Sequence, residues 1–203
     1  CEVVAAPYTG LPVPAAAELV IEGEMAQGDQ AEEGPFGEWT GYYGGGVAPE
    51  PVVRGKSICH RNDPIILGTS PAIPPSDTTY YRTPIRSAMI WNQLEAAGVS
   101  GVKGVWSHEL GGGRMFVVVS IEQHHPGHAR QAGYIAAQCH ANAYCGRMTI
   151  VVDHDIDVTD LNRVMWAVVT RADPATDYEV MKRCWSTRLD YMVNRRQLGE
   201  AIT

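Results

Sequence analysis

The sequence lacks the marks of several protein classes. No apolar run approaches the length of a membrane-spanning helix. No basic-then-apolar secretory leader is visible either, an absence that is uninformative if the true N-terminus lies upstream. Positive charge is scarce: 16 Lys and Arg stand against 23 Asp and Glu, and the net charge of −7 argues against a nucleic-acid-binding surface. The five cysteines are odd in number and form no Cys-x-x-Cys pair. Reduced thiols in a cytoplasmic protein are the simplest expectation.

Two glycine triplets lack the companions of a phosphate-binding loop. Residues 44–46 and 111–113 have neither the lysine nor the following helix that such a loop requires. We predict that both are flexible linkers. What the chain does have is an ordinary globular composition, with 45% hydrophobic and 19% charged residues. Its 203 residues suffice for one or two domains with a buried core.

Residues 1–83 have the pattern of strands and turns. Early prolines exclude a helix across the start. Residues 18–24 and 56–60 predict strands, whereas the prolines in 47–53 predict a short or edge strand. Residues 65–68 are a short apolar run for which we predict burial. We infer part of a β-barrel-like domain.

From residue 84 the pattern changes to alternating helices and strands. Ile90 and Leu94 form a helical apolar stripe, and Asp157 or Thr159 is the predicted N-cap of the last helix in the series. The predicted elements are a helix over 85–97, a strand buried on both faces over 115–121, a helix over 126–139, a strand over 148–152 and a helix over 161–168. A helix between two strands favours their parallel pairing. The fold class is therefore predicted to be mixed α/β.

Glu33 and Glu38 are the candidate chemical pair. On a helix they would point about 140° apart, and on a strand to opposite faces, so neither element brings them together. The intervening Gly-Pro-Phe-Gly predicts a turn, because Pro35 fixes its own φ and glycine permits unusual dihedrals. Such a turn can aim both carboxylates at one reacting centre for acid–base chemistry. On spacing alone, a solvated surface turn is the more frequent alternative.

The run from Glu33 to Glu38, Glu-Gly-Pro-Phe-Gly-Glu, resembles the signature of the UbiD decarboxylase family, whose members use prenylated flavin mononucleotide (prenylated FMN). Gly41 and Tyr42 continue the match, and further blocks recur in the family's order at 1–2, 13–24, 60–65, 126–129, 155–157 and 166–171. The resemblance implies that residues 1–83 are the C-terminal part of a split-barrel-like, flavin-binding domain. It implies that residues 84–203 are the α/β C-terminal domain, used for oligomerisation.

The resemblance also implies roles for four residues. Glu38 is the acid that protonates the substrate carbon after CO2 is lost, and Glu38 and Trp39 contact the cofactor. Glu33 pairs with an arginine and helps to keep the flavin in its active form. Glu2 is a ligand of a divalent metal, Mn2+ or another, that anchors the cofactor phosphate, which suits a carboxylate oxygen. K+ is a further candidate ion.

Family members are considerably longer, so the chain is expected to be the C-terminal portion of one. The missing N-terminal half would carry the arginine of a Glu-Arg-Glu triad, and an asparagine and a histidine that bind the metal. The implied activity is reversible decarboxylation of an aromatic or α,β-unsaturated carboxylic acid. The implied partners are further protomers, in a dimer or hexamer, and a flavin prenyltransferase that supplies the cofactor. Trp106 and Tyr144 are candidates for the edge of the substrate pocket, and a short helix over 190–203 is expected to dock on another protomer.

Two alternatives remain open. One is a non-catalytic UbiD-like subunit that serves a larger carboxylase complex. The other is a small α/β metal-binding module. His124, His125 and His128 suggest zinc, but Pro-Gly interrupts them and no Cys or acid stands at a customary spacing, so structural histidines are favoured. Acids within 153–157 suggest Mg2+, but capping of the next helix is favoured.

Overall fold

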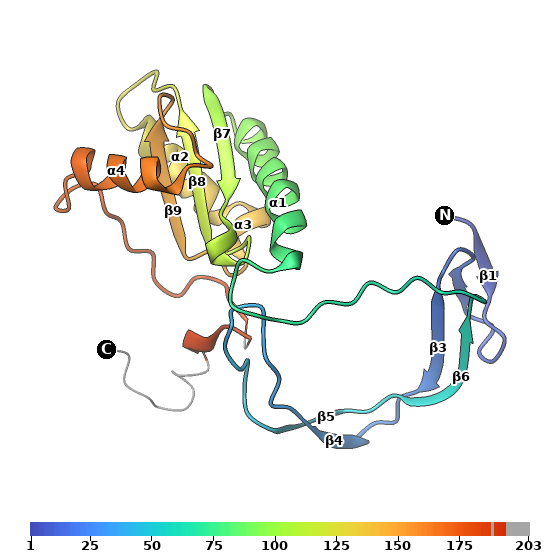
Figure 1. Cartoon of the computed structure of the whole chain (residues 1–203). Helices are drawn as coiled ribbons and strands as arrows, with labels where there is room; N and C mark the ends of the chain where they lie inside the picture. Colours follow the sequence, from blue (N-terminus) through green and yellow to red (C-terminus); the bar gives the residue numbers. More distant parts are fainter. Residues whose placement is uncertain (188, 194–203) are drawn as a thin grey trace. The chain divides into compact units, whose positions relative to one another are not determined.

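The computed structural model describes residues 1–187 and 189–193. The chain forms two compact units (Figure 1). The first consists of residues 1–35 and 46–70, and the second of residues 36–45 together with the chain from 71 onward. Within the described residues, no helix combines the length and the apolar character needed to cross a bilayer.

The first unit contains three two-stranded antiparallel sheets. Their pairs are β1 (Val3–Ala5) with β2 (Pro12–Pro14), β3 (Leu19–Glu24) with β6 (Arg54–His60), and β4 (Gln30–Glu33) with β5 (Ala48–Pro51). β3 and β6 confirm the two predicted strands, and β5 confirms the short strand among prolines. β4, which the sequence pattern does not predict, ends at Glu33.

Apolar side chains of the first unit are largely exposed. Ile21 and Ile58 are paired across β3 and β6, and they are 60% and 66% exposed. Ile65 and Leu67 lie in the run predicted to be buried, yet each is 83% exposed and belongs to no strand. That prediction was wrong because an apolar run is buried only where another layer covers it, and a two-stranded ribbon supplies none.

A buried carboxylate ties β3 to the turn between β1 and β2. Glu22 is 5% exposed and accepts hydrogen bonds from the Tyr8 N–H at 3.1 Å, the Thr9 N–H at 2.7 Å and the Thr9 hydroxyl at 2.8 Å. Burial alone raises the pKa of Glu22, but the hydrogen bonds from Thr9 and Tyr8 outweigh it and hold the pKa below its usual 4.5. The ionised carboxylate is therefore the form that stabilises this contact.

Acid is expected to weaken the first unit through Glu22. A carboxyl whose pKa is lower in the folded state stabilises folding above its unfolded pKa, and this contribution is lost as the pH falls through the folded pKa. Glu22→Gln should lower the urea midpoint near neutral pH and flatten its decline between about pH 5 and about pH 3, followed by circular dichroism. Glu24→Gln, at an exposed position of the same strand, is the matched control and should change both far less. A Glu22 variant that declines as steeply as wild type would contradict this role.

The second unit has one three-stranded sheet, in the order β7-β8-β9. The strands are β7 (Val102–Ser107), β8 (Phe116–Ile121) and β9 (Met148–Asp153). β8 and β9 are parallel, as predicted, and β7 is antiparallel to β8. The sequence pattern does not predict β7, because Gly101 and Gly104 indicate a break. Gly104 instead lies at a shift in register and leaves room for Val158, whose Cγ2 would lie 3.0 Å from a Cβ there.

Helices cover both faces of this sheet. They are α1 (Asp77–Ala96), α2 (His128–Gln138), the short α3 (His140–Ala143) and α4 (Leu161–Arg171). α1 and α2 pack on one face and α4 on the other (Figure 1). Ile90 and Leu94 are fully buried, as predicted, against Val117 and Val119 of β8, while Val118 faces the α4 layer. The central strand is thus buried on both faces, and the mixed α/β class is confirmed.

α1 begins earlier than the sequence pattern predicts, at Asp77 instead of residue 85. Ser76 is the N-cap: its N–H donates to Thr79 Oγ1 at 3.0 Å, and the Thr79 N–H donates to the Ser76 carbonyl at 2.8 Å. Pro84, which suggests a helix start in the sequence, lies inside the helix. The earlier start adds Arg82 to α1.

α4 is capped by Asp160, so the prediction of Asp157 or Thr159 was wrong. Asp160 Oδ1 accepts two backbone N–H groups, that of Asn162 at 3.0 Å and that of the next residue at 3.2 Å. Asp157 Oδ1 accepts the N–H and the hydroxyl of Thr159, which closes the turn before the helix. Most of the helix predicted over 190–203 lies outside the described residues.

Candidate functional site

The four predicted site residues divide between the two units. Glu2 and Glu33 belong to the first unit, and Glu38 and Trp39 to the second. Glu33 is the last residue of β4, and its side chain is exposed. Gly34, which follows it, has a φ of +95°, the kind of dihedral expected of the turn. Convergence of Glu33 and Glu38 on one reacting centre stays a prediction.

Glu2 presents one exposed carboxylate at the start of β1. Its backbone carbonyl accepts the Ala15 N–H at 3.0 Å, which fixes the chain while the side chain stays exposed. A divalent cation takes several oxygen ligands. In the part of the chain that the structure describes, no three His, Cys, Asp or Glu side chains are grouped to hold a metal. Glu2 belongs to no such group there, and its role as a metal ligand stays a prediction.

The two clusters considered as metal sites make structural contacts. Asp155 accepts two hydrogen bonds from the Arg171 guanidinium, at 2.9 and 2.7 Å, and these bonds lower the pKa of its carboxyl. His128 is 1% exposed, and its Nδ1 accepts the His124 N–H at 3.2 Å. The His125 ring stacks on His128, with ring centroids 4.5 Å apart.

Glu38 is held in a tight hairpin loop. Gly37 and Tyr43 form an isolated antiparallel bridge around it. The Glu38 N–H donates to the Tyr42 carbonyl at 2.8 Å, and the Glu38 carbonyl accepts the Gly41 N–H at 2.8 Å. The loop fixes both backbone groups of Glu38, whose side chain is half-buried.

Gly44 makes room for the Glu38 side chain. A Cβ on Gly44 would clash with Glu38 Cγ and lie 3.3 Å from the carboxyl carbon. Gly46, two residues later, would have nothing within 4 Å of such an atom. The prediction that 44–46 is only a linker was therefore wrong for Gly44, because its backbone closely approaches a candidate catalytic side chain.

Trp39, directly after Glu38, rests on the second glycine triplet. Gly112 has a φ of +66°, and a Cβ there would lie 2.6 Å from Trp39 Cε3. The Arg114 guanidinium carbon lies 5.3 Å from the Trp39 ring centroid, a cation–π contact. This triplet is therefore a support for Trp39, and the prediction of a linker was wrong here too.

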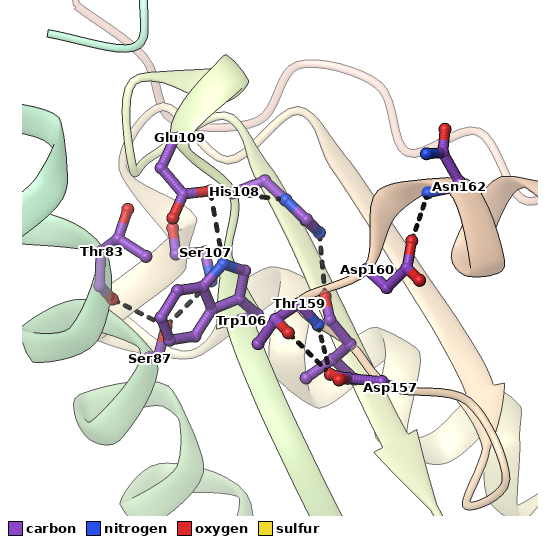
Figure 2. Close-up of polar contacts among 11 residues, drawn as sticks. Thr83, Ser87, Trp106, Ser107, His108, Glu109, Asp157, Thr159, Asp160 and Asn162 are labelled. Atoms are coloured by element: carbon purple, nitrogen blue, oxygen red, sulfur yellow. Dashed lines mark hydrogen bonds and ion pairs between the residues drawn. The ribbon is translucent and has the colours of Figure 1, made fainter.

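Polar contacts fix the end of β7 and the 3-10 turn η1 (Glu109–Gly111) that leads to this support (Figure 2). The Ser107 N–H donates to a serine hydroxyl of α1 at 2.9 Å. His108 Nε2 lies 2.9 Å from the Val158 carbonyl. Burial lowers the pKa of His108, so the ring is neutral near pH 7 and its Nε2–H donates to that carbonyl. The end of β7, which leads to the turn that supports Trp39, is thus hydrogen-bonded to α1 and to the loop before α4.

A cavity of about 530 Å3 in the second unit is lined by three arginines, Arg82, Arg86 and Arg114. Sequence reasoning does not single them out. The available signal is the four-residue spacing of Arg82 and Arg86, which becomes visible only when α1 starts at Asp77. Tyr144, a predicted edge of the substrate pocket, also lines this cavity.

Comparison with known proteins matches both parts of the chain. The model of the UbiD family, 3-octaprenyl-4-hydroxybenzoate carboxy-lyase Rift-related domain, matches residues 1–74, and that of the corresponding C-terminal domain matches residues 79–202. Phenolic acid decarboxylase of Bacillus subtilis (strain 168) is 34% identical over 179 residues, which cover 86% of this chain and 36% of that protein. The chain spans little more than a third of the length of such curated relatives.

Solved structures agree. An evolved dimeric form of the UbiD-class enzyme HmfF from Pelotomaculum thermopropionicum, in complex with prFMN, superimposes with a TM-score of 0.74 at 34% identity, covering 90% of this chain and 41% of that one. The vanillic acid decarboxylase of Sedimentibacter hydroxybenzoicus in its open form gives a TM-score of 0.75 at 28% identity, covering 93% and 40%.

Proposed function

Because the chain belongs to the UbiD family of carboxy-lyases, we propose that the complete protein reversibly decarboxylates an aromatic or α,β-unsaturated carboxylic acid with prenylated FMN. Relatives named as phenolic acid and vanillic acid decarboxylases support the reaction type. A relative solved with prFMN supports the cofactor. The observation that carries the proposal is Glu38, held at both backbone groups within the matched signature.

Glu38 is the proton donor in this proposal. Prenylated FMN supplies the electron-withdrawing centre that makes loss of CO2 feasible. The Glu38 carboxyl then donates its proton to the carbon that has lost CO2, and in the reverse direction its carboxylate removes that proton. Glu33 pairs with an arginine supplied from outside this chain, and Trp39 borders the cofactor. The fixed hairpin backbone favours this chemistry, because the acid needs little reorganisation before proton transfer.

Partners and surroundings follow from the same proposal. The protein assembles as a homo-oligomer, a dimer or hexamer, through the C-terminal domain over 84–203, and a flavin prenyltransferase supplies its cofactor. The dimeric form solved for a relative is in keeping with an oligomer. The five free cysteines are in keeping with a reducing cytoplasm. Mn2+ or another divalent cation, with K+ as a further ion, completes the cofactor site.

The direct test uses the complete protein that contains this chain, produced together with a flavin prenyltransferase. Its absorbance spectrum should show a bound flavin, and a screen of aromatic acids should detect CO2 release. A folded protein that has neither flavin nor activity would contradict the proposal and favour a non-catalytic subunit.

Loss of the Glu2 carboxylate is expected to weaken cofactor retention. Glu2→Ala in the complete protein should lower bound manganese and flavin about tenfold or more, because even residues that only support a metal ligand change metal affinity by that factor. Metal analysis and flavin absorbance per protein measure both. Glu32→Ala, another exposed acid of the first unit, is the control and should retain them. Unchanged flavin and manganese in Glu2→Ala would remove Glu2 from the metal site.

A further inference from the structure

Three arginines surround the cavity of about 530 Å3, and none of the residues lining it is an acid. Arg82 and Arg86 lie one turn apart on α1, and Arg114 directly precedes the residues leading into β8. None of the three takes part in an ion pair found among residues 1–187 and 189–193. Burial, followed by repulsion from Arg114, lowers the pKa of both Arg82 and Arg86. Grouping three positive charges around this cavity therefore lowers the stability of the folded protein.

Two of the guanidinium groups are held by neutral partners. Arg82 Nη1 donates to the Gly112 carbonyl at 3.2 Å, and Arg86 Nε donates to the Ala141 carbonyl at 2.8 Å. Carbonyl groups orient a guanidinium but cancel none of its charge. Arg86 Nη2 also donates to the Tyr144 carbonyl at 3.4 Å. The N–H groups outside these bonds can donate to a ligand that carries negative charge.

Arg114 is positioned by aromatic rings. Its guanidinium carbon lies 5.3 Å from the Trp39 ring centroid and 5.9 Å from that of Tyr144. Its Nε is buried and has no hydrogen-bond partner within the described residues. Arg114 thereby connects the cavity to the residue that follows Glu38.

The other walls of the cavity suit a flat ring. Tyr81, Tyr144, Trp185 and His140 contribute aromatic faces, and neighbouring aliphatic side chains complete the lining. The volume lies within the range of small-molecule sites. Guanidinium groups match the planar, two-oxygen geometry of a carboxylate. The fitting ligand is therefore an aromatic ring that carries a carboxylate.

We propose that this cavity binds a second carboxylate of the substrate, so that the acid consumed is an aromatic dicarboxylic acid. This inference rests on the proposed decarboxylase function. The carboxylate that leaves as CO2 loses its charge during the reaction, so arginines bound to it would stabilise the substrate over the transition state. A second carboxylate keeps its charge throughout, and holding it orients the ring without that penalty. The neutral hydroxyl of a phenolic acid has no comparable need of three cations.

Calorimetric titration of the complete, flavin-loaded protein tests this without requiring turnover. Benzene-1,3- or benzene-1,4-dicarboxylate is expected to bind about tenfold or more tightly than benzoate and 4-hydroxybenzoate, the size expected of one charge-assisted contact. Arg114→Gln should reduce that preference to about twofold or less. This variant keeps the backbone hydrogen bond from the Arg114 N–H to the Gly111 carbonyl, and an unchanged melting temperature would show that it folds. Arg163→Gln, which removes an exposed arginine beside Trp166, should leave the preference intact.

Three results would overturn the inference. They are equal affinity for benzoate and both dicarboxylates, a preference that survives Arg114→Gln, and inorganic phosphate that competes as well as a dicarboxylate, which would indicate a general anion site. CO2 release from monocarboxylic acids alone would leave the decarboxylase function standing while this inference fails. Arginine-dependent binding of a dicarboxylate, with CO2 released neither from it nor from any other acid in the screen, would overturn the substrate assignment together with the function.

Discussion

Decarboxylation by the complete protein is expected to fall about 100-fold or more when Glu38 is replaced by Gln, while the flavin stays bound. The amide has nearly the same volume as the carboxyl, and the hairpin bonds at residue 38 come from the backbone, so the loop should keep its geometry. The variant lacks only an acidic proton to deliver. CO2 release and flavin absorbance on the same preparation measure the two effects.

Glu32→Gln is the matched control for this experiment. Glu32 is an exposed acid on β4, beside Glu33 but outside the predicted site. Its loss should leave turnover within about twofold of wild type, as expected of an exposed charge. A Glu38→Gln enzyme that loses flavin along with activity would indicate a binding role, and one that retains activity would exclude Glu38 as the proton donor.

The parts of the fold that follow from local pattern were predicted from the sequence. β8 and β9 are rich in β-branched apolar residues, and the helix between them makes their parallel pairing the expected one. β7 escapes prediction because Gly104, which suggests a break, accommodates Val158 from a distant loop. Burial of the run over 65–68 fails for a similar reason, since burial depends on a covering layer that a local pattern does not reveal.

Only part of the candidate site was likewise predictable from the sequence. Glu33 and Glu38 stand out because two glycines and a proline separate them, and the resemblance to a known signature gives them roles. The support for Trp39 does not stand out: Gly112 contacts this tryptophan from more than seventy positions later in the chain. Arg114 joins α1 arginines that are distant in sequence. Tertiary packing sets contacts of this kind, and neither hydrophobic periodicity nor turn-forming residues predict them.

Gly44→Ala is expected to lower turnover by about tenfold to 100-fold without unfolding the protein. The backbone at Gly44 does not require a positive φ, so alanine is tolerated there, but its Cβ meets Glu38 Cγ. The strain is relieved most easily when the Glu38 side chain changes its torsions, which moves the carboxyl away from the position that the hairpin gives it. A displacement on the order of 1 Å in a reacting group is enough for a loss of this size. CO2 release, flavin content and melting temperature together separate this effect from unfolding.

Gly46→Ala provides the matched control within the same glycine triplet. A Cβ at Gly46 meets nothing within 4 Å, and its φ does not favour glycine, so turnover should match wild type. If both variants lose activity equally, the triplet acts through its flexibility and not through room for Glu38. If Gly44→Ala retains full turnover, the side-chain position that Gly44 permits is not the one from which the proton is delivered. A selective loss in Gly44→Ala, with flavin retained, would tie turnover to the placement of one carboxyl group.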